Sequence, residues 1–246
     1  MKNYQKLRNS IVSQFPNHVD EVDLLIASVL NKSSVLLQGK MANEFSNVMK
    51  VITSSIEPIG KPPHYFKSDV LIRELSNNMS IDSLPEYIVI RDVDLESESQ
   101  ISILNEIVKR CAVLTSKWYE TNDSNLSLLA SIPVQIFKLD DVSIPKQVTI
   151  TTVNVDLNVV DYLSGIGFTT DSLTALKEIV DRCKKFVLIP DSKIKEGTTI
   201  LKIVALLRGR EHIDIEELEL MKYILPNDED QYAIVTSIIS NVLSKY

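Results

Sequence analysis

Hydrophobic residues recur at helical and strand-like spacings along the first part of the chain. Over residues 18–30 the apolar positions form one stripe at helical spacing, which predicts an amphipathic helix, and residues 31–34 interrupt it. The short apolar run 35–37 predicts a strand. Gly39 marks a turn after it, and residues 45–52 return to helical spacing. This segment is therefore predicted to run helix, strand, loop, helix.

Further strands and helices are predicted to alternate. Residues 87–90 form an unbroken apolar run, typical of a strand that is covered on both faces of a parallel sheet. A helix is predicted over 97–110, and strands are predicted at 112–115 and 134–139. The β-branched run 148–155 fits either an added strand or an extended linker, and the pattern leaves both open. This alternation predicts a parallel α/β sheet.

Beyond residue 157 the pattern is helical. The predicted helices cover residues 172–185, 191–208, 215–225 and 229–245. Asp214 with Glu217 three positions later fits a capping box, and Pro226 lies just past the helix that it would stop. We expect two domains, an α/β domain over residues 1–157 and a small helical domain over 158–246.

Composition and charge narrow the function classes. The chain has 246 residues, of which 44% are hydrophobic and 24% charged, as in ordinary soluble globular proteins. No apolar run approaches the roughly 20 residues of a membrane span, and the N-terminus lacks the features of a secretory signal, so we expect a cytoplasmic protein without membrane contact. A net charge of −7 disfavours nucleic acid as a partner. The short basic clusters at 184–185 and 208–210 are interpreted as solvated helix ends.

Few side chains suggest chemistry of their own. Cys111 and Cys183 are widely separated among apolar neighbours, which predicts reduced, buried thiols. The three histidines, His18, His64 and His212, are isolated in sequence and do not have the spacing of metal ligands. The sequence has an acidic cluster made of Asp92, Asp94, Glu96 and Glu98. This cluster fits the start of a helix better than a cation-binding site. We expect no metal, no cofactor and no catalytic nucleophile.

Three segments, taken in order, carry a family resemblance. Residues 18–39 (HVDEVDLLIASVLNKSSVLLQG) precede residues 87–110 (YIVIRDVDLESESQISILNEIVKR), and residues 172–225 include the pattern Ala-x-x-x-Gly-Arg ending at Arg210. This order resembles AAA+ ATPases, and the residues resemble the MoxR-type branch over about residues 15–225. The resemblance implies a three-layer αβα domain with a parallel sheet followed by a small all-α lid. It also implies ATP-driven remodelling by hexameric rings.

The phosphate-binding loop of that family is not preserved in this chain. A working P-loop reads Gly-x-x-x-x-Gly-Lys-Ser/Thr, in which glycines let the backbone wrap phosphate and lysine neutralises it. With Gly39 as the first glycine, Glu44 replaces the second glycine and Phe45 replaces the lysine, while Ser46 agrees. Glu44 adds an anion where phosphates would sit. Lys40 follows Gly39 directly, far from the position of the motif lysine.

The other catalytic positions implied by the resemblance also depart from the family pattern. The Walker B acids align with Arg91, a cation that would repel magnesium, and with Asp92, about one methylene shorter than Glu. The polar sensor falls near Lys117, the arginine finger near Ile132 and the second sensor near Lys193, which keeps a positive charge. The sequence therefore predicts a degenerate ATPase site.

Three functions remain open at this stage. We favour a pseudo-ATPase that acts as a scaffold or assembly subunit through protein contacts, forming a homo-oligomer or joining an active AAA+ paralogue. The alternatives are a divergent working ATPase that uses Lys40, Lys50 or a partner's cation, and a nucleic-acid-binding accessory subunit. Trp118 and Tyr119 fit either partner-facing anchors or core residues.

Overall fold

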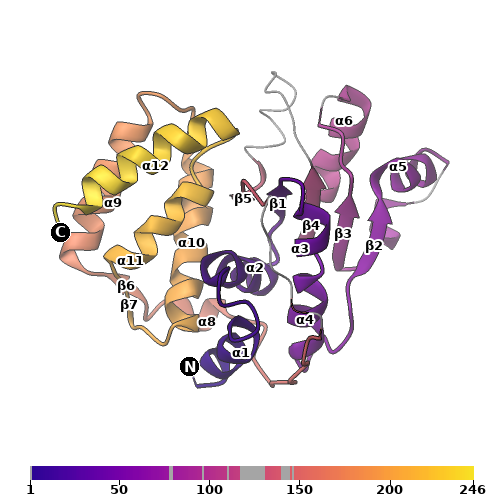
Figure 1. Cartoon of the computed structure of the whole chain (residues 1–246), viewed down its shortest axis with the longest axis horizontal. Coiled ribbons are helices and arrows are strands. Elements are labelled where there is room, and N and C mark those ends of the chain that lie inside the picture. Colours follow the sequence, from indigo (N-terminus) through magenta and orange to yellow (C-terminus); the bar gives the residue numbers. More distant parts are fainter. Residues whose placement is uncertain are drawn as a thin grey trace.

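The computed structural model describes residues 2–77, 80–95, 97–109, 111–116, 131–139, 145 and 147–246. In Figure 1 the sheet and the helices that cover it lie on the right, and the helices of the lid lie on the left. The elements of the sheet region are α1 (Lys2–Val12), α2 (Val19–Asn31), β1 (Val35–Gln38), α3 (Ala42–Phe45), α4 (Val48–Ser55), β2 (His64–Lys67), α5 (Ser68–Ser76), η1 (Ile81–Ser83), β3 (Tyr87–Arg91), α6 (Glu98–Ile107), β4 (Cys111–Ser116) and β5 (Val134–Ile136). Those that follow are α8 (Val160–Leu163), β6 (Gly167–Phe168), α9 (Thr170–Cys183), α10 (Asp191–Leu207), β7 (His212–Ile213), α11 (Ile215–Leu218), η2 (Glu219–Tyr223) and α12 (Glu229–Leu243).

The main sheet has five parallel strands in the order β2-β3-β4-β1-β5, which confirms the predicted parallel α/β sheet. Val35 of β1 is in register with Val113 on one side and with Val134 on the other. Because all strands run the same way, the loop that follows β1 emerges beside the ends of β4 and β5. The sheet thus brings the predicted phosphate loop next to the carboxyl ends of its neighbours.

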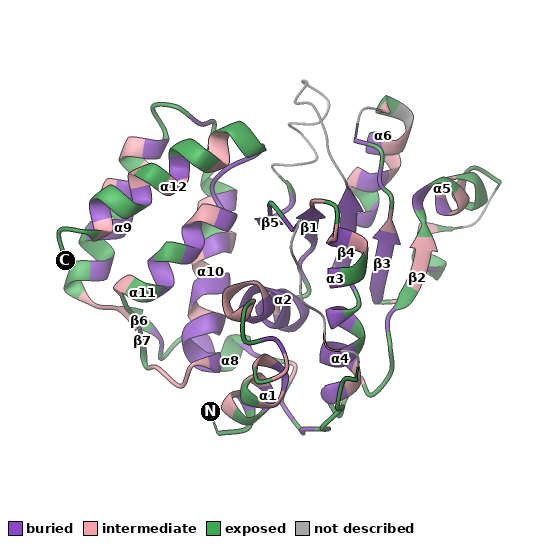
Figure 2. Cartoon of the chain, viewed as in Figure 1, coloured by how far each residue is buried: buried purple, intermediate pink, exposed green. Residues whose placement is uncertain are grey.

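Side chains alternate strictly between the two faces of the sheet. Val35 and Leu37 belong to the hydrophobic cluster that includes α2 and α4, whereas Leu36 belongs to the cluster that includes α5 and α6. Both faces are therefore covered by helices, which explains why the central strands read as unbroken apolar runs. Figure 2 shows β1 buried and the edge strand β2 only partly buried.

The lid shares its hydrophobic core with the first two helices. One continuous cluster joins Leu7 of α1 and Leu25 of α2 to Ile200 and Val204 of α10, and extends to Val235 of α12. The lid is thus packed against α1 and α2. The boundary at residues 157 and 158 remains a prediction, because a shared core does not define it. None of the described helices combines the length and apolarity that a membrane span requires.

The structure decides one alternative that the sequence left open, divides two predicted helices and confirms the capping box. The segment 148–155 is an extended linker, whose one isolated bridge joins Val153 to Ile56. The helix expected over 45–52 is divided into α3 and α4, and the one over 215–225 is divided into α11 and the 3-10 helix η2. The capping box is confirmed, because Asp214 and Glu217 make both of its reciprocal bonds.

Candidate functional site

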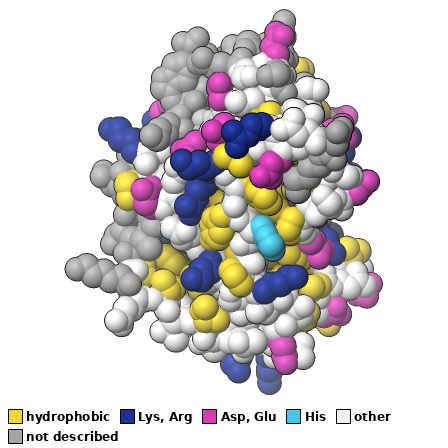
Figure 3. All heavy atoms as spheres, turned by 90° about the vertical axis from the view of Figure 1, so that its right-hand side faces the viewer, with side chains coloured by type: hydrophobic (Ala, Val, Ile, Leu, Met, Phe, Trp, Pro, Cys, Tyr) yellow, Lys and Arg dark blue, Asp and Glu magenta, His cyan; other side chains and the backbone are white. Residues whose placement is uncertain are grey.

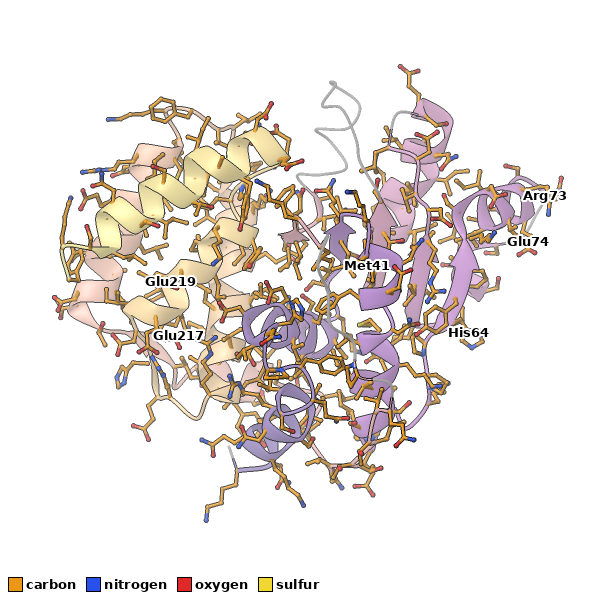
Figure 4. The ribbon with its side chains drawn as sticks, viewed as in Figure 1. Met41, His64, Arg73, Glu74, Glu217 and Glu219 are labelled. Atoms are coloured by element: carbon orange, nitrogen blue, oxygen red, sulfur yellow. The ribbon has the colours of Figure 1, made fainter. Side chains whose placement is uncertain are left out.

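The loop after β1 uses its backbone donors within the protein. The Gly39 N–H donates to the Ser116 carbonyl (3.2 Å), and the Met41 N–H donates to the Leu139 carbonyl (2.7 Å). Figure 4 labels Met41 in this loop, between β1 and α3. In a phosphate-binding loop, successive backbone N–H groups point at the anion. Here two of them are directed at carbonyl groups of the neighbouring segments.

Gly39 is required by this close approach. Its φ of +126° is disfavoured for other residues, and a Cβ at this position would lie 2.6 Å from the Leu139 backbone nitrogen. The Leu139 N–H in turn donates to the Gln38 carbonyl (2.9 Å). The segment after β5 is therefore bonded directly onto the loop after β1.

Three polar side chains connect the loops at the carboxyl ends of β1, β3 and β4. The Asn43 amide donates to the Asp92 carboxylate (2.7 Å), the Thr115 hydroxyl donates to the Asn43 amide oxygen, and the Asp92 N–H donates to the Thr115 hydroxyl (3.2 Å). We call this the Asn43–Asp92–Thr115 network. The hollow that these residues line leaves no room for a water molecule. The network occupies the region in which the resemblance would place phosphate and magnesium.

The other phosphate-loop positions point in different directions. Phe45 is fully buried, and its ring contacts the ring of His18 at 5.4 Å between centroids. Ser46 is buried and donates to the Asn43 carbonyl (2.6 Å), whereas Glu44 is exposed. The residue in the place of the phosphate-binding lysine is thus part of the hydrophobic core.

Arg91, at the end of β3, is held by neighbours on one face of the sheet. Its guanidinium donates to the Asn47 side-chain oxygen (2.7 Å) and lies over the ring of Tyr65, 4.7 Å from the centroid. Burial raises the pKa of Tyr65, and the charge of Arg91 opposes that shift. Arg91 and Asp92 are adjacent in sequence but have different partners, and Asp92 has a left-handed backbone conformation (φ 57°).

The remaining predicted positions are distributed through the fold. Ile132 is fully buried just before β5. Lys193 is 2% exposed inside the lid, where its amine donates to the Pro226 carbonyl (2.9 Å) and to the Asn227 side-chain oxygen (2.6 Å). Burial lowers the pKa of Lys193 to about 7, and the nearby charge of Asp228 partly offsets this. Lys193 thus joins α10 to the turn before α12.

Some predicted residues lie outside the described part of the chain. These are Lys117, Trp118, Tyr119 and Glu96. Among the described residues, no group of three His, Cys, Asp or Glu side chains is arranged to hold a metal ion. Cys183 is buried and free, as predicted, and burial raises its pKa to about 11.

A buried ionic cluster fixes the lid to α1 and α2. Arg208, at the end of α10, pairs with Asp23 (2.9 Å) and Asp20 (2.9 Å) of α2 and with Glu217 (3.2 Å) of α11. Arg8 of α1 also binds Asp23 (2.7 Å). Asp23 and Glu217 have 0% side-chain exposure, so both charges depend on these arginines. Figure 4 labels Glu217 in the lid.

The interpretation of residues 208–210 as a solvated helix end was wrong for Arg208. Its side chain is only 13% exposed. Burial alone would lower its pKa, but the carboxylates of Asp23, Asp20 and Glu217 outweigh burial and raise it. Arg210, which is more exposed, also pairs with Glu217. Sequence reasoning missed this cluster because its acidic members on α2 are distant along the chain.

Comparisons with known proteins agree with this architecture. Residues 169–239 match the family model for the AAA lid domain. An uncharacterised protein of Methanocaldococcus jannaschii is 22% identical over an alignment 304 positions long, gaps included, which covers 100% of this chain and 76% of that protein. A crystal structure from Cytophaga hutchinsonii, described as a candidate ATPase, has a TM-score of 0.64 at 11% identity, covering 100% of this chain and 96% of that one. The chain therefore has an α/β AAA+-like fold with a helical lid, and its lid region is related to AAA lid domains.

Proposed function

We propose that this chain is a non-hydrolysing protein of the MoxR-type branch of AAA+ ATPases. It acts as a scaffold or assembly subunit through protein contacts, alone as a homo-oligomer or together with an active AAA+ paralogue. A fold of this kind does not establish activity, so the proposal depends on the site itself. It requires neither nucleotide nor metal.

The observation that carries the proposal is the Asn43–Asp92–Thr115 network. Its bonds tie the loops after β1 and β3 to the end of β4, where phosphate and magnesium would have to enter. Binding of a nucleotide would require these bonds, and those of the Gly39 and Met41 amides, to be broken first. Asn43 and Thr115 would lose their hydrogen-bond partners when a nucleotide bound. No motif lysine would compensate, because Phe45 occupies its position and is buried.

The packing of the lid supports the same proposal. Arg208 joins α10 to α2 through two aspartates, and Tyr223 of η2 donates to the Glu21 carboxylate (2.8 Å). Motions of one domain against another are expected where the interface is small and polar. This interface instead contains a continuous apolar core and a buried ionic cluster, which favours a fixed arrangement suited to presenting surfaces.

The experiment is a titration of the purified full chain with ATP, with and without Mg²⁺, read by calorimetry and by thermal shift. A working P-loop ATPase assayed in parallel is the positive control. We expect no heat of binding and no change in Tm, because a ligand stabilises a protein only if it binds the folded state. A Mg²⁺-dependent rise in Tm would contradict the proposal.

A divergent working ATPase is the second candidate, and one observation favours it. Lys40 is exposed and lies beside Asn43 and Asp92, so this region retains one cation of the loop after β1. A single-turnover assay would decide the matter, with Asp92→Ala as the control that removes the remaining acid. Turnover that is lost in Asp92→Ala would establish this candidate. Nucleic-acid binding loses support, because Arg208 is neutralised by carboxylates.

A further inference from the structure

The two edges of the main sheet differ in how they are covered. At the β5 edge, the residues that follow the strand contact the lid: Phe137 packs against Tyr232 (5.1 Å between ring centroids) and Lys138 pairs with Glu229 (3.6 Å). At the opposite edge, the backbone of β2 makes no hydrogen bond to any described element outside β3 and α5. Figure 1 shows β2 at the outer end of the sheet, away from the lid.

The open edge has a chemical character of its own. The segment 60–67 (GKPPHYFK) contains two lysines and one histidine but no acidic residue, although the chain as a whole carries a net charge of −7. Lys61, His64 and Lys67 are exposed, and neither lysine forms an ion pair with a described residue. The segment 60–67 therefore carries two lysine charges that form no ion pair within the described part of the chain.

Apolar surface accompanies these cations. Tyr65 and Phe66 are each half-buried and pack against the opposite faces of the sheet, Tyr65 with the cluster of α2 and α4 and Phe66 with that of α5 and α6. Figure 3, which looks onto this side of the molecule, shows hydrophobic side chains gathered together, with Lys and Arg side chains and some Asp and Glu side chains around them. A strand added at this edge would cover the exposed part of both rings.

A pocket continues the edge at its amino end. It has a volume of about 280 Å³ and is lined by residues before and at the starts of β2 and β3, among them Pro62, His64 and Tyr87, together with Leu157. An extended chain lying along β2 would pass this pocket. Its lining combines prolines, an aromatic ring and aliphatic side chains with the polar side chains of Lys61, His64 and Glu86, so an apolar side chain of the incoming segment would rest on the apolar part.

We propose that β2 binds an extended segment of a partner protein, rich in Asp or Glu and in apolar residues, as an added strand of the sheet. This inference rests on the proposed function as a module for protein contacts and names the surface and the partner chemistry. Main-chain hydrogen bonds to β2 supply affinity, as in other cases of strand addition. The acidic residues meet Lys61 and Lys67, and the apolar ones cover Tyr65 and Phe66.

Charge argues against a second copy of this chain as the occupant. Antiparallel pairing of two β2 strands about a twofold axis between Tyr65 and Phe66 would place His64 opposite Lys67 of the other copy. Each copy would also bring Lys61 and Lys67, and no acidic residue of the segment 60–67, to the shared edge, where like charges repel. Pro62 and Pro63 also keep the edge short, which limits indiscriminate pairing. An acidic segment meets no such repulsion.

The test is selection of a phage-displayed library of random linear peptides on the immobilised full chain. Enriched peptides are then labelled and their affinities measured by fluorescence anisotropy. The test variant carries Lys61→Glu and Lys67→Glu. The matched control carries Lys185→Glu and Lys195→Glu, which make the same change in net charge at exposed lysines of the lid region. Hydrogen exchange of the complex reports whether amides of residues 64–67 become protected.

The proposal expects enriched peptides in which acidic and apolar residues alternate. Their binding should weaken roughly tenfold in the test variant, because two attractive contacts become repulsive, and should stay within about twofold in the control. Failure to enrich peptides, equal binding to both variants, or protection outside residues 64–67 would overturn it. A concentration-dependent dimer that protects residues 64–67 without peptide would identify a second copy instead. None of these results depends on nucleotide. The ATP titration therefore tests the proposed function independently of peptide binding at β2.

Discussion

Replacing Arg208 with methionine should loosen the lid from α2. Methionine keeps much of the length of the side chain but removes the charge that serves Asp23, Asp20 and Glu217. The variant leaves Asp23 with Arg8 as its remaining arginine, at 2.7 Å, and leaves Glu217 with Arg210, at 3.2 Å. Both carboxylates have 0% side-chain exposure, so water does not replace the lost partner without local opening.

The expected loss follows from this geometry. Removing one partner of a buried ion pair costs about 3–5 kcal/mol, because the other charge remains buried. Since Arg8 still contacts Asp23, we expect the lower end, about 3 kcal/mol. For a chain of this size each kcal/mol corresponds to about 2–4 °C, so Tm should fall by about 6–12 °C.

Differential scanning calorimetry measures this change, with Lys109→Met as the control. Lys109 pairs with Glu106 on the surface, where both side chains are more than half exposed (66% and 53%), and its loss should shift Tm by less than about 2 °C. Adding Asp23→Asn to Arg208→Met should recover part of the loss, because it removes a buried charge that has lost one of its two arginines. A shift for Arg208→Met no larger than that of the control would refute the assigned role of the ionic cluster.

Three further substitutions probe other parts of the structure. Gly39→Ala should lower the free energy of unfolding by about 1–3 kcal/mol, seen as a lower urea midpoint, because its Cβ would meet the Leu139 nitrogen at 2.6 Å and its φ is +126°. Phe45→Lys should cost about 3–5 kcal/mol in the same assay and gain no MgATP binding, because it places a charge in the core beside His18. Lys193→Met should abolish a rise in stability between about pH 7 and the ordinary lysine pKa of about 10.4, because the unfolded chain holds the Lys193 proton in that window and the folded chain, with its pKa lowered to about 7, does not.

Each of these predictions has a contradicting result. An unchanged midpoint for Gly39→Ala would mean that the loop relaxes freely away from Leu139. Binding of MgATP by Phe45→Lys would mean that the phosphate site is intact apart from that cation. A stability difference between wild type and Lys193→Met that does not vary with pH from about 7 to 10 would mean that Lys193 stays protonated in the folded chain.

Much of the sheet and of the lid was predictable from the spacing of hydrophobic residues. The run 87–90 corresponds to β3, and the predicted helix 191–208 corresponds to α10, because both elements are buried along much of their length. The edge strand β2 and the helix α5 after it were missed. Residues 64–67 are only partly buried, so their sequence does not need the apolar run or the alternation that identifies central strands.

The candidate site was predictable only in part. The positions of Gly39, Glu44 and Phe45 followed from the resemblance, but nothing in their pattern indicated that Asn43 would bind Asp92. Thr115 is a polar residue near the end of an apolar strand, which weakly indicated a position at the carboxyl end of the sheet. Side-chain pairs between separate loops depend on the tertiary arrangement, which local spacing does not encode.

The ionic cluster shows the same limit. Asp23 is an acidic residue within the helical stripe of α2, and an acid on a buried face predicts a cationic partner. Its partners, Arg8 and Arg208, come from opposite ends of the chain, so the sequence did not single them out. The capping box at Asp214 and Glu217 was predictable because it is local, whereas the second role of Glu217 as a partner of Arg208 was not.

The central claim is that this AAA+-like chain does not use nucleotide. Calorimetric titration of the full chain with ATP in the presence of Mg²⁺ tests it most directly. The account predicts no heat of binding at any accessible ATP concentration, and a Tm that does not change with nucleotide. Saturable, Mg²⁺-dependent binding that is weakened by Asp92→Ala would contradict it.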